Sequence, residues 1–199
     1  MPEVISDIIV APATVYYAPL ASSLPADTVA AGTAWGGAWV KVGYTSEPLS
    51  VQYEADEVDI EIEQSLTAIR RVKTKENLTL ETVLAEFYLD ALQLGMGGVV
   101  SDTPAGASQP GMEELALGGL ATITARMWGF EGAYIDEDAA TFPIRFFIYS
   151  GTAKINGKLS FAKGEMTGTP LQIMALADMT KSVGSRLVLI QKMLEAATS

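Results

Sequence analysis

The sequence predicts an antiparallel β-sheet with one α-helix. Several short runs alternate apolar and polar residues, as strands with one buried face do. Turn-forming residues, such as the pair Asn156 and Gly157, separate these runs. One segment alone, at about residues 85–94, repeats its apolar residues at the three- and four-residue spacing of a helix. These observations indicate a mainly β chain.

The predicted strands are spread over the whole chain. At 199 residues the chain is near the upper limit for one hydrophobic core, so residues 1–199 are expected to form a single domain. Residues 186–194 fit either a strand or a helix, because their apolar positions match both spacings. The expected strands are residues 13–17, 39–44, 51–63, 69–82, 120–128, 144–149, 153–161 (around a turn) and 170–177.

Two stretches are expected to lie outside the sheet. Residues 21–38 are rich in Ala, Gly and Ser, and with the apolar segment before them they predict an extended N-terminal arm over about residues 1–38. Gly95 is expected to end the helix, and small residues and prolines then predict a long loop over about residues 95–112. Loops of this length usually have a function.

The strand expected at residues 51–63 is strongly acidic. Its apolar residues occupy odd positions first and even positions later, and the change falls at Asp56 and Glu57, which predicts a β-bulge there. The basic run at residues 69–75 predicts a neighbouring strand with cross-strand charge pairs.

The composition favours a subunit that buries several faces in an assembly. Hydrophobic residues make up 49% of the chain and charged residues only 19%, so a monomer would have too little polar surface to cover itself. The net charge of −11 disfavours tight binding of DNA or RNA, which depends on Lys and Arg. Neither an export signal nor a membrane span is visible, and we expect the protein to be made in the cytosol.

Few residues are suited to catalysis. The chain has no Cys and no His, which excludes thiolate nucleophiles, imidazole bases and the usual zinc ligands. We therefore predict no enzyme activity, no cofactor and no metal. The acidic series on residues 54–63 fits a solvated or deliberately negative surface, although the separation of its carboxylates also suits a glycosidase pair. Trp35, Trp39 and Trp128 fit core packing, or alternatively the stacking platform of a carbohydrate-binding module.

Two groups of motifs occur in an order that points to a known family. Trp39 leads through residues 43–47 into the acidic strand, followed by residues 71–74 and 84–86. Residues 163–165, 170–178 and 186–190 form the second group. Together they resemble the major tail tube proteins of long-tailed, siphophage-type bacteriophages.

The resemblance implies a tail tube fold, an antiparallel β-sandwich or barrel-like domain with one flanking helix. It further implies homohexameric rings that stack into a hollow conduit for the genome, with tape measure, terminator and distal tail proteins as partners. Such a protein is assembled in the host bacterial cytoplasm and ends in the virion tail. Related hexameric proteins, such as a secretion-tube subunit or a tail terminator, are the alternatives.

The resemblance also suggests a purpose for the acidic series. Carboxylates facing the lumen would repel the DNA backbone, which would then slide rather than bind. The N-terminal arm and the loop at residues 95–112 would become ordered on assembly and bridge neighbouring subunits or rings. The candidate lumen residues are Glu54, Asp56, Asp59, Glu61 and Glu63.

Overall fold

The computed structural model describes residues 13–64, 66–135, 140–159, 161, 163 and 167–194. Within them the chain is mainly β, as the sequence predicts. The elements are β1 (Thr14–Ala18), β2 (Val40–Lys41), β3 (Ser50–Ile60), β4 (Arg70–Leu84), α1 (Leu89–Met96), β5 (Val99–Thr103), β6 (Met112–Ala116), β7 (Arg126–Ile135), β8 (Thr141–Ile155), β9 (Thr169–Ala175) and β10 (Val188–Lys192).

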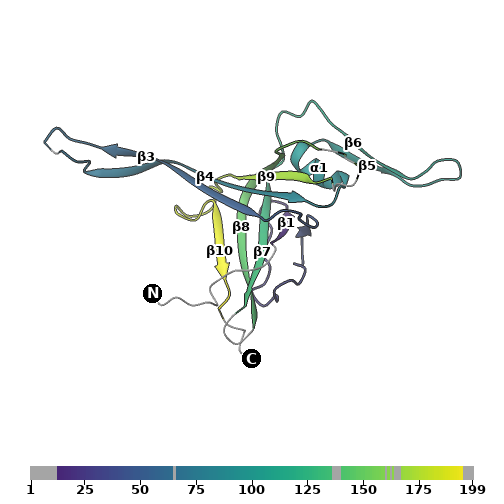
Figure 1. The fold of residues 1–199 in the computed structure, drawn as a ribbon, viewed down its shortest axis with the longest axis horizontal. Coiled ribbons are helices and arrows are strands. Elements are labelled where there is room, and N and C mark those ends of the chain that lie inside the picture. Colours follow the sequence, from purple (N-terminus) through teal and green to yellow (C-terminus); the bar gives the residue numbers. More distant parts are fainter. Residues whose placement is uncertain are drawn as a thin grey trace.

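The main sheet is antiparallel and divides at β8. Its strand order is β2-β1-β7-β8-β9-β4-β3, and β10 also pairs with β8. On the edge of β8 opposite β7, residues 144–148 pair with β10 and residues 151–155 pair with β9. In Figure 1, β7, β8 and β10 lie upright in the lower part of the molecule, whereas β9, β4 and β3 lie across the top. The result is a sandwich-like domain, and the described strands do not close into a barrel.

Trp128 fills the corner where β8 changes partners. Its ring is 1% exposed, and its indole Nε1 donates a hydrogen bond of 3.1 Å to the carbonyl oxygen of Gly151. The pairing of β7 with β8 is irregular at this point, between Arg126 and Trp128. The largest core cluster surrounds this corner and joins both layers; it includes Val15, Leu80, Leu84, Phe130, Ile148, Leu171 and Ile173.

A buried ion pair joins the loop after β1 to the sheet. Glu131 and Arg145 face each other on β7 and β8, with 2.8 Å between Arg145 Nε and Glu131 Oε2. Glu131 also accepts hydrogen bonds from Trp35 Nε1 and from the backbone N–H of Gly32, both at 2.9 Å. Arg145 donates to the backbone carbonyls of Ala26 (3.2 Å) and Val29 (2.6 Å). We call this group the Glu131–Arg145 clamp.

An extended N-terminal arm was predicted at about residues 1–38. For the described part, residues 13–38, the prediction was wrong, because this segment packs on the sheet. Residues 14–18 form β1, which is paired on both edges by β2 and β7. Trp35 stacks on Tyr16 with 4.2 Å between the ring centroids, so the following loop packs on the sheet. Composition could not show this, because the loop is fixed by polar partners more than 90 residues away. Residues 1–12 lie outside the described residues.

Helix α1 begins four residues later than predicted and contains Gly95 instead of ending there. The backbone N–H of Ala85 still bonds the carbonyl of Tyr44, so strand-like pairing continues past β4. A Cβ at position 95 would lie 2.7 Å from Ile155 Cδ1, so glycine lets the helix approach β8 closely. The helix ends at Gly97, whose φ is 75°.

The loop predicted at residues 95–112 is largely regular structure. After α1, β5 and β6 form a hairpin in a small sheet of their own, with Thr103 opposite Met112. The turn at residues 104–111 is rich in Pro, Ala and Gly, and this composition masked the short strands beside it. Four other predicted segments differ in their bounds. Only residues 40–41 of the strand predicted at 39–44 are strand, and the strand predicted from residue 120 begins at residue 126, as β7. Residues 156–159 are not strand, and residues 188–192 of the segment that fitted either a strand or a helix form β10.

Tyr88 connects the start of α1 to the sheet. Its hydroxyl donates a hydrogen bond to the carbonyl oxygen of Val42. Burial, and then the nearby Tyr17 and acidic groups, raise the pKa of Tyr88 from 10.0 to about 12. Between these values the unfolded chain loses its proton first, so the free energy of unfolding should fall as pH rises from 10 through about 12.

We expect Tyr88→Phe to remove this alkaline loss and to lower stability at neutral pH by about 1 kcal/mol. Urea unfolding from pH 7 to pH 12 measures both effects. Tyr44→Phe is the matched control, because Tyr44 is 67% exposed. An alkaline limb that is identical in wild type and Tyr88→Phe would contradict the assignment.

Candidate assembly surfaces

Two arms project from opposite sides of the body. The outer parts of β3 and β4 form the β3–β4 arm, and β5 and β6 form the β5–β6 arm (Figure 1). Leu78, Leu80, Thr82 and Leu84 alternate into the core, whereas residues 70–76 of β4 are exposed. The apolar alternation thus anchors one half of β4 and leaves the other half outside the core. Surfaces of this kind are available for contact with other chains.

The β3–β4 arm has the charge pairs that the sequence predicts, and a bulge at the predicted change of register, but the bulge is on β4 and not on β3. Its register shifts between Asp56 and Glu57, where Thr74 is the extra residue on β4. Arg71 binds Asp59 through two hydrogen bonds of 2.6 and 3.0 Å, and these bonds lower the pKa of the carboxyl. Lys73 donates to the Tyr53 hydroxyl at 2.9 Å and to Glu76 at 3.2 Å, and both bonds raise its pKa. All these groups are exposed, so the pairs order the arm more than they stabilise it.

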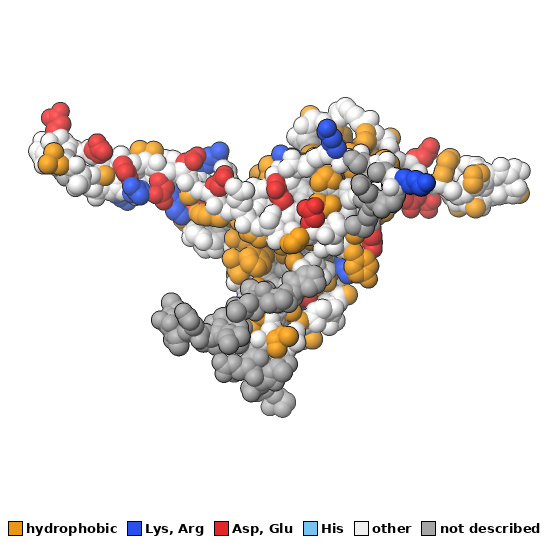
Figure 2. Space-filling view, in the orientation of Figure 1, with side chains coloured by type: hydrophobic (Ala, Val, Ile, Leu, Met, Phe, Trp, Pro, Cys, Tyr) orange, Lys and Arg blue, Asp and Glu red, His pale blue; other side chains and the backbone are white. Residues whose placement is uncertain are grey.

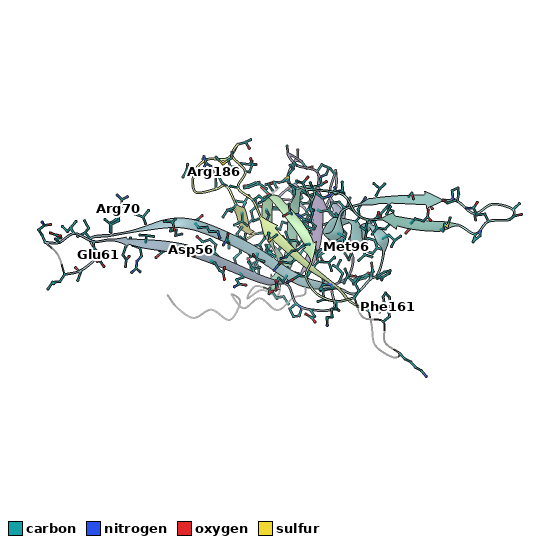
Figure 3. The ribbon with its side chains drawn as sticks, turned by 90° about the horizontal axis from the view of Figure 1, so that it is seen from above. Asp56, Glu61, Arg70, Met96, Phe161 and Arg186 are labelled. Atoms are coloured by element: carbon teal, nitrogen blue, oxygen red, sulfur yellow. The ribbon has the colours of Figure 1, made fainter. Side chains whose placement is uncertain are left out.

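The five candidate lumen residues do not share one surface. Glu54 and Asp56 lie on the same strand face, and Glu54 accepts a hydrogen bond of 2.8 Å from Gln52. Asp59 lies on the opposite face with Arg71. Glu61 and Glu63 follow β3 in the connection at the end of the arm. Figure 3 shows Asp56 part-way along the arm and Glu61 nearer its end.

The face that holds Glu54 continues as a polar surface across the sheet. Glu81 on β4 accepts hydrogen bonds from Asn156 Nδ2, at 3.2 Å, and from Gln172 Nε2 on β9. Gln172 pairs in turn with Lys154 on β8. We call this surface the polar sheet face. Successive side chains of a strand point to opposite faces of the sheet, and the residues between these polar ones point into the core.

A groove lies between the β3–β4 arm and the loop at residues 176–187. Its volume is about 690 Å³, and its lining includes Lys73, Lys75, Glu76 and Arg186. Arg186 Nε donates to the carbonyl of Lys181 at 3.2 Å. Neither Lys75 nor Arg186 forms an ion pair within the part of the chain that the structure describes. We call this the basic groove, and Figure 3 shows Arg186 on the loop beside the arm.

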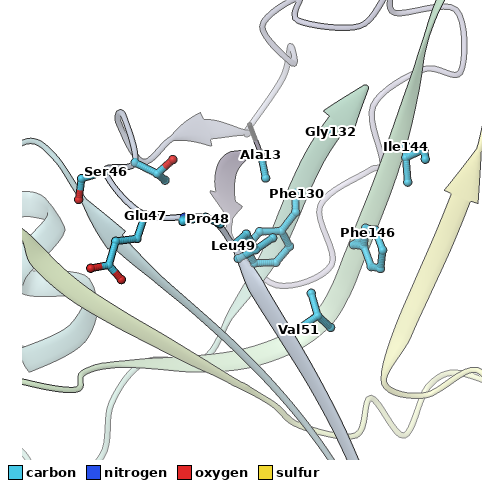
Figure 4. Close-up of a pocket in the computed structure, with 11 residues that line it drawn as sticks. Ala13, Ser46, Glu47, Pro48, Leu49, Val51, Phe130, Gly132, Ile144 and Phe146 are labelled. Carbon is cyan, nitrogen blue, oxygen red and sulfur yellow. The ribbon is translucent and has the colours of Figure 1, made fainter. Parts of the chain in front are cut away.

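A second hollow, of about 530 Å³, is apolar (Figure 4). It opens between the start of β3 and the strands β7 and β8. Ser46 and Glu47 are at one side, and no described residue there forms a nucleophile and base pair. Its apolar lining includes Leu49, Val51, Phe130, Ile144 and Phe146.

The β5–β6 arm differs from the β3–β4 arm in its charges. Asp102 and Glu113 are directly opposite each other on one face, and Glu114 is opposite Ser101 on the other face. No Lys or Arg occurs in residues 76–125, so the arm has no basic partner of its own. Figure 2 shows acidic side chains on this arm and a mixture of acidic and basic ones on the β3–β4 arm.

The three tryptophans belong to the core. Trp35, Trp39 and Trp128 are 4%, 6% and 1% exposed, so they offer no platform on which a sugar could stack. Among the described residues, no group of three or more Asp and Glu side chains is arranged to hold a metal ion.

The comparison with known families identifies the class of protein. A family model described as phage tail tube protein matches residues 4–188. The chain belongs to the phage tail tube protein family. No curated protein matches it. As a tail tube protein it is a structural component of the virion tail, and its family implies self-assembly together with other tail proteins.

Membership of the tail tube family explains several features of the composition. A structural subunit has no need of Cys or His chemistry, and the family indicates a non-enzymatic role. Apolar side chains such as Tyr53, Val58 and Val99 are more than half exposed in the single chain, which is expected of a subunit that is covered by its neighbours. Among the described residues, no helix has the length and apolar character needed to cross a bilayer.

Proposed function

We propose that the chain forms hexameric rings that stack into a hollow tail tube, through which the genome is delivered to the host. The match to the tail tube family over residues 4–188 is the observation that supports this most strongly. The two arms support it as well, because they extend from opposite sides of the body and their exposed apolar residues require a cover. The whole chain then acts as one tail tube domain.

The polar sheet face is our candidate for the lumen wall. It is continuous over β3, β4, β9 and part of β8, and it presents Glu54, Asp56 and Glu81. The opposite face of the same strands supplies Leu78 and Leu80 to the core and cannot line a lumen. The face carries the carboxylates of Glu54, Asp56 and Glu81, which would repel the phosphates of DNA. It also holds Lys75, opposite Asp56, and Lys154, opposite Gln172, so its carboxylates outnumber its lysines by three to two. Asp59 is paired with Arg71 on the other face and is a weaker candidate.

Other tail proteins complete the proposal. The tube would form in the cytoplasm of the host around a tape measure protein, with a terminator at one end and distal tail proteins at the other. These partners fit a subunit that polymerises along one axis, because the polymerisation must be started at one end and stopped at the other.

The test is assembly of the purified full-length protein, followed by electron microscopy and reconstruction. We expect hollow tubes of stacked six-subunit rings, with a tail extract added as nucleus if needed. In the reconstruction, Glu54 and Asp56 should face the lumen. A protein that stays at 21.1 kDa at every concentration and with the nucleus would overturn the tube proposal. Tubes with both residues on the outside would overturn the lumen assignment alone.

A further inference from the structure

The β5–β6 arm has an uncompensated negative charge at a defined place. Asp102 and Glu113 are cross-strand neighbours, and like charges in this position destabilise a hairpin. Both are exposed, and no described residue forms an ion pair with either. The turn beyond them, residues 104–111, has no charged side chain and is made mainly of small residues. The arm thus combines an uncharged turn of small residues with two carboxylates that have no basic partner among the described residues.

The basic groove has the complementary charge. Lys75 and Arg186 line it from two different elements, the β3–β4 arm and the loop before β10. Lys73 in the same lining already bonds Tyr53 and Glu76. Lys75 lies opposite Asp56 across the strand pair but forms no ion pair with it, so Lys75 and Arg186 are the groups left to bind an anion. The volume of about 690 Å³ accommodates several side chains. Its rim includes Val183, which is 85% exposed.

The acidic face and the groove cannot meet within one molecule, because the two arms leave the body on opposite sides (Figure 1). We propose that the Asp102–Glu113 face of the β5–β6 arm docks into the basic groove of the neighbouring subunit in the same ring. The contact is head-to-tail, and such contacts generate closed rings when the rotation between copies closes. This inference rests on the proposed function, since it assumes that the subunits form rings.

Two charge-reversed variants of the full-length protein test the contact. The arm variant is Asp102→Lys with Glu113→Lys, and the groove variant is Lys75→Glu with Arg186→Glu. Each places like charges in the contact, so each alone should raise the concentration needed for assembly by on the order of tenfold or more. In a mixture, the two variants can alternate around an even-numbered ring. The basic arm of the arm variant then meets the acidic groove of the groove variant, and the acidic arm of the groove variant meets the basic groove of the arm variant. Mixing them should therefore restore assembly.

Neighbouring residues provide matched controls. Glu114→Lys changes the same arm on its other face, and Arg70→Glu changes the β3–β4 arm outside the groove. Both should assemble like wild type. The proposal fails if the arm variant assembles as well as wild type, or if two folded variants fail to complement each other. If wild type itself forms no rings or tubes, the proposed function fails first.

Circular dichroism would show whether a charge-reversed variant folds. If it does not fold, a milder variant tests the contact instead. Asp102→Asn with Glu113→Gln removes the charges while keeping the shape of both side chains. Added salt should weaken assembly of wild type and have much less effect on this neutral variant. Equal salt dependence in the two proteins would overturn the contact.

Discussion

Replacing Glu131 with alanine is expected to lower the free energy of unfolding by about 3–5 kcal/mol, because it leaves the buried charge of Arg145 without its partner. Arg145 is fully buried and Glu131 nearly so. The change also removes the acceptor for Trp35 Nε1 and for the backbone of the loop after β1. Urea unfolding followed by circular dichroism measures the loss, and tryptophan fluorescence should report exposure of Trp35.

The matched control is Asp59→Asn, which breaks another Arg–carboxylate pair at a comparable distance. Arg71 and Asp59 are exposed, so water replaces the lost partner and the change in stability should be far smaller. Glu131→Gln should lie between the two, because its amide oxygen can still accept hydrogen bonds. Equal effects of Glu131→Ala and Asp59→Asn would mean that the clamp does not hold the loop on the sheet.

The second large effect is expected for Trp128→Ala, at about 3–5 kcal/mol, the range for removing a large buried aromatic side chain. The cavity would open where β8 passes from β10 to β9. Because the two layers of the sheet meet at this corner, we also expect the variant to assemble poorly at temperatures where it is still folded. Differential scanning calorimetry and electron microscopy measure the two consequences.

Trp128→Phe separates volume from hydrogen bonding. It keeps most of the ring but lacks the N–H that binds the carbonyl of Gly151, so its cost should be about 1–3 kcal/mol. Assembly of this variant should remain close to wild type. A phenylalanine variant as damaged as the alanine variant would show that the hydrogen bond to Gly151, and not the volume of the side chain, supports the corner.

Strand periodicity predicted the fold class well, because an exposed and a buried face leave an alternating pattern wherever a strand forms. The change of register at Asp56 and the basic partner strand were also confirmed, although neither face of β3 is buried. Helix α1 was placed early, since the apolar spacing near residue 85 belongs to the end of β4. Pairing between distant strands, such as β8 with both β9 and β10, has no local signature.

Site residues were harder to predict than strands. The acidic series was noticed from its charge, but its division between two faces depends on register. Glu131 and Arg145 were missed, although a charged residue inside each of two apolar strands is a usable signal for a buried pair. Asp102 was in the segment predicted as loop and Glu113 directly followed it, so their position opposite each other could not be seen.

The edge position of β3 has a consequence for the pool of subunits that are not yet assembled. In the described sheet β3 is the last strand, and its outer backbone groups are open to any extended chain. Open edges of this kind lead to amyloid-like aggregation unless something interrupts them. Here the bulge at Thr74 and the carboxylates along β3 provide that interruption. The edge of β3 is thus less able to pair with the strands of other unassembled subunits in a non-native way.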